Sequence, residues 1–153
     1  MKTLIIYDGV YGNTRRIAEA IGSGLTPTDT RIINVNDAKQ EDLKGAELLI
    51  VGSPTYGGRP KPSTQAFLDR ITAGALDGVK VAAFDTRFGN NQNIALRLLM
   101  KAINFAAPRI AKALEEKGGK LAMPPEGFFV NGKEGPLKTG EIERATVWVK
   151  NLK

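Results

Sequence analysis

The sequence predicts an α/β fold, a three-layer sandwich in which helices cover both faces of a five-stranded parallel sheet. The first observation is a set of continuous apolar runs at 4–6, 48–51 and 81–84, the pattern of strands buried on both faces. The second is that helical patterns of apolar residues separate the strand-like runs along the chain. The third is that a polar, Gly-containing stretch follows each apolar run, at the sheet edge where such folds bind ligands.

The elements can be placed in chain order. We expect strands at 3–7, 31–35, 47–52, 80–84 and 120–123, with 124–137 extending the last strand towards the final helix. A first helix begins near Asn13, a short one lies over 37–45, a third opens at Ser63 or Thr64, and a last one covers 141–152. Right-handed crossovers leave few topologies, and we predict the strand order 2-1-3-4-5. No repeat or linker divides the chain, so 1–153 is expected to be one domain.

The segment 88–105 is longer than a minimal domain of this kind needs. Leu96, Leu99, Met100 and Ile103 recur with a helical period, and Pro108 is expected to kink that helix or to start a second one. The segment is either a long helix packed on the sheet or a lid or homodimer surface over the adjacent site. Both interpretations stay open at this point.

Composition excludes several classes of function. The 153 residues contain no Cys and no His, which excludes thiol catalysis, disulfides, Ser-His-Asp triads and typical zinc sites. The net charge of +6 suggests acidic protein partners, while the basic residues are too dispersed to predict nucleic-acid binding. No run approaches the ~20 apolar residues of a membrane span, and the amino end lacks signal-peptide features, so we expect a cytoplasmic protein without a membrane partner.

The first polar stretch consists of Asp8, Gly9, Val10, Tyr11, Gly12, Asn13 and Thr14. Gly9 and Gly12 allow a tight turn that brings the backbone close to a ligand, and a helix starts directly afterwards. The free N–H groups and the positive dipole end of a helix start attract phosphate. Asp8 would repel a phosphate, so we expect it to point away or to cap the turn through its side chain.

Two further stretches complete the candidate site. They are Ser53, Pro54, Thr55, Tyr56, Gly57 and Gly58 after the third strand, and Asp85, Thr86, Arg87 and Phe88 after the fourth. Tyr56 and Phe88 either stack on a planar ligand or belong to the core. Asp85 and Arg87 either hydrogen-bond the ligand or pair with each other on the surface. We predict no catalytic side chain and no metal site.

The segment 5–18 resembles the strand, phosphate loop and helix entry of flavodoxins. The segment 51–58 is similar to the second loop of that superfamily, and 85–88 follows the fourth strand, where the family has its third loop. The resemblance covers almost the whole chain and implies a flavodoxin-like strand order and FMN as the cofactor. It also implies that the Gly57–Gly58 peptide changes orientation when flavin N5 gains a proton. Gly9 and Val10 depart from the family, which usually has hydroxyl residues there.

The resemblance implies an FMN-binding electron-transfer protein that shuttles electrons between redox partners with acidic docking surfaces. One alternative is an FMN-dependent NAD(P)H or quinone oxidoreductase, in which 88–105 forms part of a substrate pocket, within one chain or across a homodimer. An alternative of another class is an interaction module of the same fold that binds no flavin.

Overall fold

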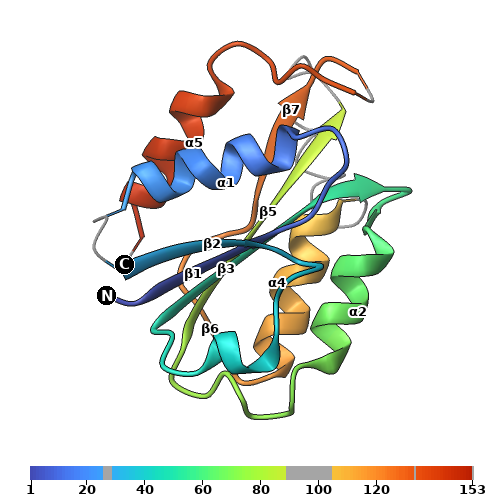
Figure 1. The fold of residues 1–153 in the computed structure, drawn as a ribbon. Helices are drawn as coiled ribbons and strands as arrows, with labels where there is room; N and C mark the ends of the chain where they lie inside the picture. The colour runs from blue at the N-terminus through green and yellow to red at the C-terminus, as the bar shows by residue number, and fades with distance from the viewer. Residues whose placement is uncertain (26–28, 89–104, 133, 153) are drawn as a thin grey trace.

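The computed structural model describes residues 1–25, 29–88, 105–132 and 134–152 (Figure 1). The strands are β1 (Thr3–Tyr7), β2 (Thr30–Asn34), β3 (Leu48–Tyr56), β4 (Arg59–Pro60), β5 (Lys80–Phe88), β6 (Lys120–Leu121) and β7 (Glu126–Val130). The helices are α1 (Asn13–Ser23), α2 (Pro62–Arg70), α4 (Ala106–Glu116) and α5 (Glu141–Lys150), with a short 3₁₀ helix at Gln40–Leu43. None of the described helices combines the length and apolarity needed to span a bilayer.

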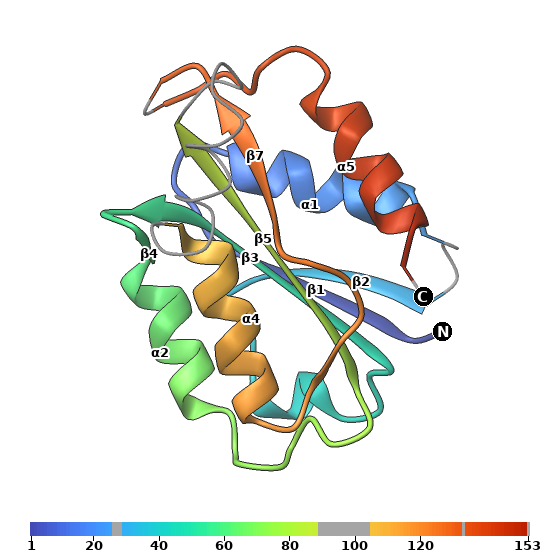
Figure 2. The ribbon, with the colours of Figure 1, turned by 180° about the vertical axis from the view of Figure 1, so that it is seen from behind.

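The sheet confirms the predicted topology. Its order is β2-β1-β3-β5-β6 with parallel pairing throughout, which corresponds to the predicted order 2-1-3-4-5 because the two-residue β4 only forms an antiparallel hairpin with β3. The fifth strand is split into two pieces, since β6 (labelled in Figure 1) pairs with the beginning of β5, and β7 pairs with its end (Figure 2). Pro124 and Pro125 lie between these pieces, and proline has no N–H to continue a ladder.

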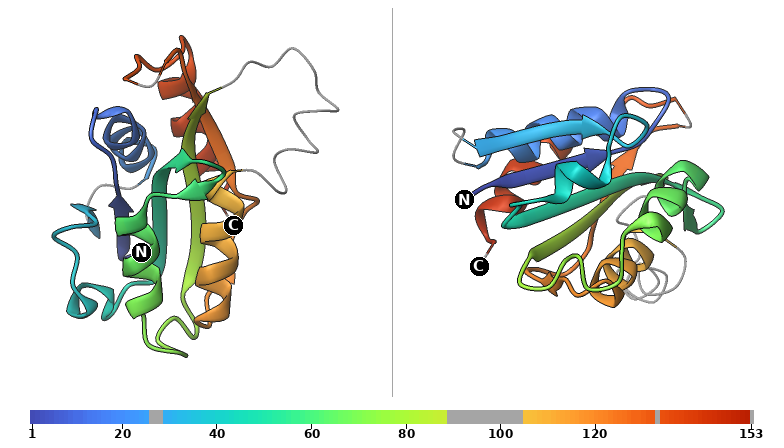
Figure 3. Two further views of the ribbon diagram at one scale, coloured as in Figure 1. Left: turned by 90° about the vertical axis from the view of Figure 1, so that its right-hand side faces the viewer. Right: turned by 60° about the horizontal axis from the view of Figure 1, so that its bottom comes forward.

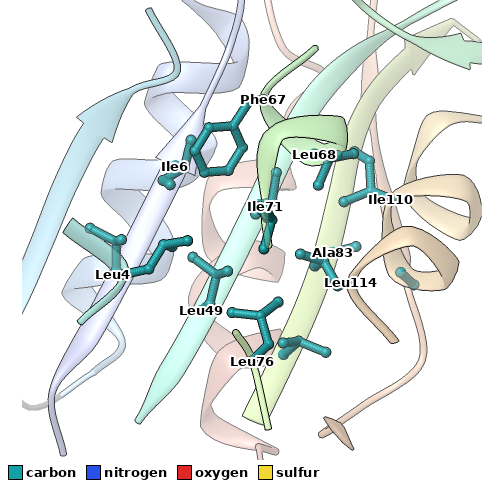
Figure 4. Packing of buried hydrophobic residues seen from close by; sticks show 14 of the residues in the cluster. Leu4, Ile6, Leu49, Phe67, Leu68, Ile71, Leu76, Ala83, Ile110 and Leu114 are labelled. Carbon is teal, nitrogen blue, oxygen red and sulfur yellow. The ribbon is translucent and has the colours of Figure 1, made fainter. Parts of the chain in front are cut away.

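Helices cover both faces of the sheet, α1 and α5 on one side and α2 and α4 on the other (Figure 3). Side chains of successive strand residues point to opposite faces, so Leu49 and Val51 of β3 pack towards α2 and α4, while Leu48 and Ile50 pack towards α1 and α5. This double burial explains the continuous apolar run. The cluster on the α2 and α4 side includes Leu4, Ile6, Leu49, Phe67, Leu68, Ile110 and Leu114 (Figure 4).

Two sequence-based expectations need correction, and one open alternative is decided. The helix expected over 37–45 is only a 3₁₀ turn at Gln40–Leu43. At its start, the backbone N–H of Lys39 donates to the Asp42 carboxylate at 2.8 Å. The stretches 53–56 and 85–88 were expected as loops, but they continue β3 and β5 because β4 and β7 supply partners for their backbones. Helix α4 begins at Ala106, so Pro108 lies in its first turn. This agrees with the alternative in which Pro108 starts a second helix. The lid, interface and core-helix alternatives for 88–105 concern residues 89–104, which lie outside the described residues.

Candidate functional site

A cavity of about 440 Å³ opens at the carboxyl edge of the sheet. Its lining consists of Gly9, Val10, Tyr11, Gly12, Asn13, Thr14, Pro54, Thr55, Tyr56, Gly57, Thr86, Arg87, Phe88 and Val130. The structure thus brings together residues from all three predicted stretches, in a volume typical of small-molecule sites. Asp8, Ser53, Gly58 and Asp85 do not line it. Val130 was missed, because an apolar residue at a strand end carries no ligand signal until its pairing opposite Phe88 is known.

The start of helix α1 faces this cavity. Gly12 is the N-cap with φ of +87°, and the helix has neither a capping side chain nor an acidic residue in its first turn. The first backbone bond from this turn runs from the Arg16 N–H to the Gly12 carbonyl at 3.0 Å. The N–H groups of Asn13, Thr14 and Arg15 therefore have no acceptor within the helix. Such an end attracts an anion.

Asp8 is buried and turned away from the cavity. Its carboxylate accepts hydrogen bonds from the Gly9 N–H and the Thr64 hydroxyl, each at 2.8 Å, and from the Ser63 hydroxyl. The Lys61 ammonium lies 3.7 Å from Oδ1, the oxygen that accepts the Gly9 N–H. Asp8 therefore connects the first loop to the beginning of α2, and the expectation that it points away or caps the turn is confirmed. Its inclusion among residues contacting the ligand is not supported by this placement.

Ser53 also has a role in joining elements. Its hydroxyl accepts the Lys61 N–H at 2.9 Å and donates to the Pro54 carbonyl at 2.9 Å, and the side chain is fully buried. These bonds connect the end of β3 to the residue that precedes α2. They leave Ser53 behind the cavity wall.

Asp85 and Arg87 form a bidentate ion pair inside the protein rather than on the surface. Both N–O distances are 2.6 Å, and the two side chains are buried. The guanidinium lies 3.6 Å from the centre of the Phe105 ring and packs against Gly127, where a Cβ atom would come within 2.1 Å of it. Asp85 also accepts the Ala107 N–H at 2.9 Å. Burial raises the pKa of Asp85, while the hydrogen bond and charge of Arg87 oppose this shift.

This pairing changes what Arg87 can contribute to the cavity. Arg87 lines the cavity, but its charge is balanced by a carboxylate that is held on the protein side. A free cation at this place would favour an anionic ligand through the full Coulomb interaction. The pair acts instead as a polar, nearly neutral wall that has a fixed geometry.

Large exposed side chains surround the cavity. Val10, Tyr11, Tyr56 and Phe88 are 66%, 45%, 43% and 56% exposed, and all four line it. The alternative in which Tyr56 and Phe88 belong to the core is therefore wrong. A group of exposed apolar side chains around one opening is typical of a binding site for a planar ligand or a partner.

Gly57 and Gly58 form the two-residue turn between β3 and β4. Their φ angles are +56° and +81°, and Tyr56 pairs with Arg59 across the turn. Positive φ at both central residues is the requirement of the type I′ hairpin turn, which favours glycine. A Cβ atom on Gly57 would meet nothing within 4 Å, so conformation rather than space selects glycine there. Reorientation of this peptide stays a prediction.

Residues 4–130 match the family model of the flavodoxin domain, which is most of the 153-residue chain. This chain belongs to the flavodoxin domain family. The flavodoxin of Aquifex aeolicus (strain VF5) is 34% identical over 113 residues, covering 68% of this chain and 61% of that protein. The flavodoxin of Clostridium beijerinckii is 31% identical over 84 residues, covering 52% and 60%. The chain thus matches less than two thirds of the length of these flavodoxins.

Solved structures show the same fold over nearly the whole length. An archaeal flavodoxin superposes with a TM-score of 0.78 at 24% identity, covering 99% of this chain and 95% of that chain. Oxidised flavodoxin 1 from Bacillus cereus gives a TM-score of 0.78 at 17% identity, with 99% and 96% covered. Flavodoxin-family proteins bind FMN, so the cofactor expected from the sequence is confirmed at the level of the family.

Proposed function

We propose that this flavodoxin-family chain binds FMN in the cavity and carries electrons between redox partner proteins, without a substrate of its own. In this proposal the amides at the start of α1 hold the phosphate, and Tyr56 and Phe88 flank the ring. Gly57 approaches the ring edge through its backbone. The bound flavin supplies the redox chemistry, and the protein supplies binding, orientation and the surroundings of the ring.

The observation that carries this proposal is a difference between α1 and the other described α-helices. A carboxylate lies at the first turn of each of the others: Asp8 at α2, Asp85 at α4 and Glu141 at α5. Within the part of the chain that the structure describes, α1 begins with no acid in its first turn, and this turn faces the cavity. A dianionic phosphate fits that end, because it would satisfy the amides that have no helical acceptor.

Charge supports acidic redox partners. The chain has a net charge of +6, and Arg16, Arg59 and Arg109 are exposed near the cavity or its hairpin. Arg109 donates to the Gly58 carbonyl at 3.1 Å, which places one of these cations beside the hairpin. Such cations steer an acidic surface towards the exposed aromatic residues. The proposal includes a cytoplasmic location, which cell fractionation would test.

Titration of the purified chain with FMN tests the proposal. We expect one FMN per chain by calorimetry, a flavin absorption spectrum after gel filtration, and reoxidation of the reduced protein by an acceptor protein. Steady turnover of a quinone with NADPH, without an added reductase, would instead identify the oxidoreductase. Absence of FMN association at any concentration tested would leave only the interaction module.

A further inference from the structure

Thr14 and Thr86 bring two buried hydroxyl groups together at the cavity wall. Their Oγ1 atoms are 2.8 Å apart, although 72 positions separate the two residues in sequence. The side chains are only 2% and 5% exposed, and both residues line the cavity. Among the described residues this is the one hydrogen bond that either hydroxyl makes.

Counting protons shows that this pair is incomplete. Each hydroxyl has one proton to donate and two acceptor positions. The bond between the two oxygens uses one proton, so the second has no acceptor on the described part of the protein. A buried hydroxyl that cannot donate loses the free energy of a hydrogen bond. The missing acceptor is therefore expected in the cavity.

The position of Thr14 decides which hydroxyl donates to the ligand. Thr14 is the second residue of α1, so its side chain stands among the amides that have no helical acceptor, whereas Thr86 lies within β5. The loop before Thr14 offers only one other hydroxyl, that of the exposed Tyr11. An anion held by the amides thus meets Thr14 before it meets Thr86.

We propose that Thr86 donates to Thr14, and that Thr14 donates its own proton to the phosphate of FMN. Thr86 is then a positioning residue, which orients the Thr14 proton towards the ligand and strengthens it as a donor. Strand β5 thereby contributes to phosphate binding at the start of α1. This inference rests on the proposed binding of FMN. It adds that the two hydroxyls make the site prefer FMN over the same ligand without its phosphate.

A double-mutant cycle tests this order of donation. The apo proteins Thr86→Val, Thr14→Val and the double variant are titrated with FMN and with riboflavin, which lacks the phosphate. We expect Thr86→Val to weaken FMN binding by about three- to tenfold, and Thr14→Val to weaken it by more. The double variant should bind FMN no more weakly than Thr14→Val alone, because Thr86 acts through Thr14. Riboflavin affinity should stay within about twofold throughout.

Two further variants make the test specific. Thr86→Ser keeps the hydroxyl and should retain FMN affinity. Thr3→Val changes an equally buried threonine at the opposite end of β1 and should leave binding of both ligands unchanged. Urea unfolding of each apo variant shows whether it is folded at the titration temperature.

Four outcomes would overturn the inference. If the losses of FMN affinity in the two single variants multiply in the double variant, the hydroxyls act separately and there is no relay from Thr86 through Thr14. If Thr86→Val weakens riboflavin as much as FMN, Thr86 only shapes the cavity. If wild type binds FMN and Thr86→Val binds it equally well, the relay alone is wrong, whereas a wild type that binds neither ligand overturns the proposed function and the relay with it.

Discussion

Replacement of Arg87 by Met tests the buried ion pair directly. The change keeps much of the side-chain volume but removes the guanidinium that Asp85 contacts through two bonds of 2.6 Å. Asp85 would keep the Ala107 N–H as a donor but would lose the only cation paired with it among the described residues. The stacking on Phe105 would also be lost.

The size of the effect follows from this geometry. Removal of one partner from a buried pair costs about 3–5 kcal/mol, out of a total stability of about 5–15 kcal/mol. Because Asp85 keeps its hydrogen bond from Ala107, we expect the loss of stability in Arg87→Met near the lower end of this range, at about 3 kcal/mol. The double change Asp85→Asn with Arg87→Met removes the unpaired charge and keeps an acceptor for that N–H. It should therefore recover about 1 kcal/mol or more.

Urea unfolding of the apo proteins measures these differences, and pH gives a second signature. Without Arg87, burial raises the folded-state pKa of Asp85 further above its unfolded value, and the hydrogen bond from the Ala107 N–H opposes only part of this shift. An acid with a raised folded pKa contributes stability below its unfolded pKa, about 4, and loses it as the pH rises through the folded value. The deficit of Arg87→Met should thus grow between acid and neutral pH. A loss below about 1 kcal/mol that does not change with pH would refute this account of the pair.

Two further changes test the core and a surface turn. A Cβ atom on Gly52 would lie 2.0 Å from the Phe84 ring, which also packs against Phe128 and Trp148. Gly52→Ala should therefore lower the free energy of unfolding by about 2–3 kcal/mol or more. If the variant unfolded at the same urea concentration as the wild type, this packing would be contradicted. The hydrogen bond from the Lys39 N–H holds the pKa of Asp42 below its usual range. The Asp42 carboxylate therefore stabilises the fold above its unfolded-state pKa, and this stability is lost as the pH falls through the folded-state pKa. If an NMR titration gave Asp42 a pKa at or above the ordinary value for aspartate, this hydrogen bond would be absent in solution.

The strands and their order could be predicted because their signals are local. The run 48–51 is apolar at every position, and a strand covered on both faces buries all four side chains at once. The start of α1 was predictable for a similar reason, since Gly12 takes a left-handed conformation directly before a helical pattern. Such signals need no knowledge of distant partners.

The ends of the strands and the pairing of their side chains could not be predicted in this way. Residues 53–56 are partly polar, and they remain extended only because β4 folds back beside them. Asp85 and Arg87 were recognised as polar residues two positions apart, but their burial depends on Phe105 and Gly127, which arrive from other parts of the chain. Local sequence does not encode which side of the cavity wall such a pair occupies.

The placement of Asp8 and Asp85 explains how two carboxylates can stand beside a proposed phosphate site. Asp8 directly follows β1 and Asp85 lies near the end of β5, and unpaired they would oppose an anion through several ångströms of low-dielectric protein. Instead, Asp8 turns towards Lys61 at 3.7 Å and Asp85 towards Arg87 at 2.6 Å. The amides of α1 are left as the local positive potential on the cavity side. In the proposed site, attraction for phosphate therefore comes from the backbone, and the hydrogen bonds that the two acids accept from Gly9 and Ala107 hold the first loop and α4 in position around it.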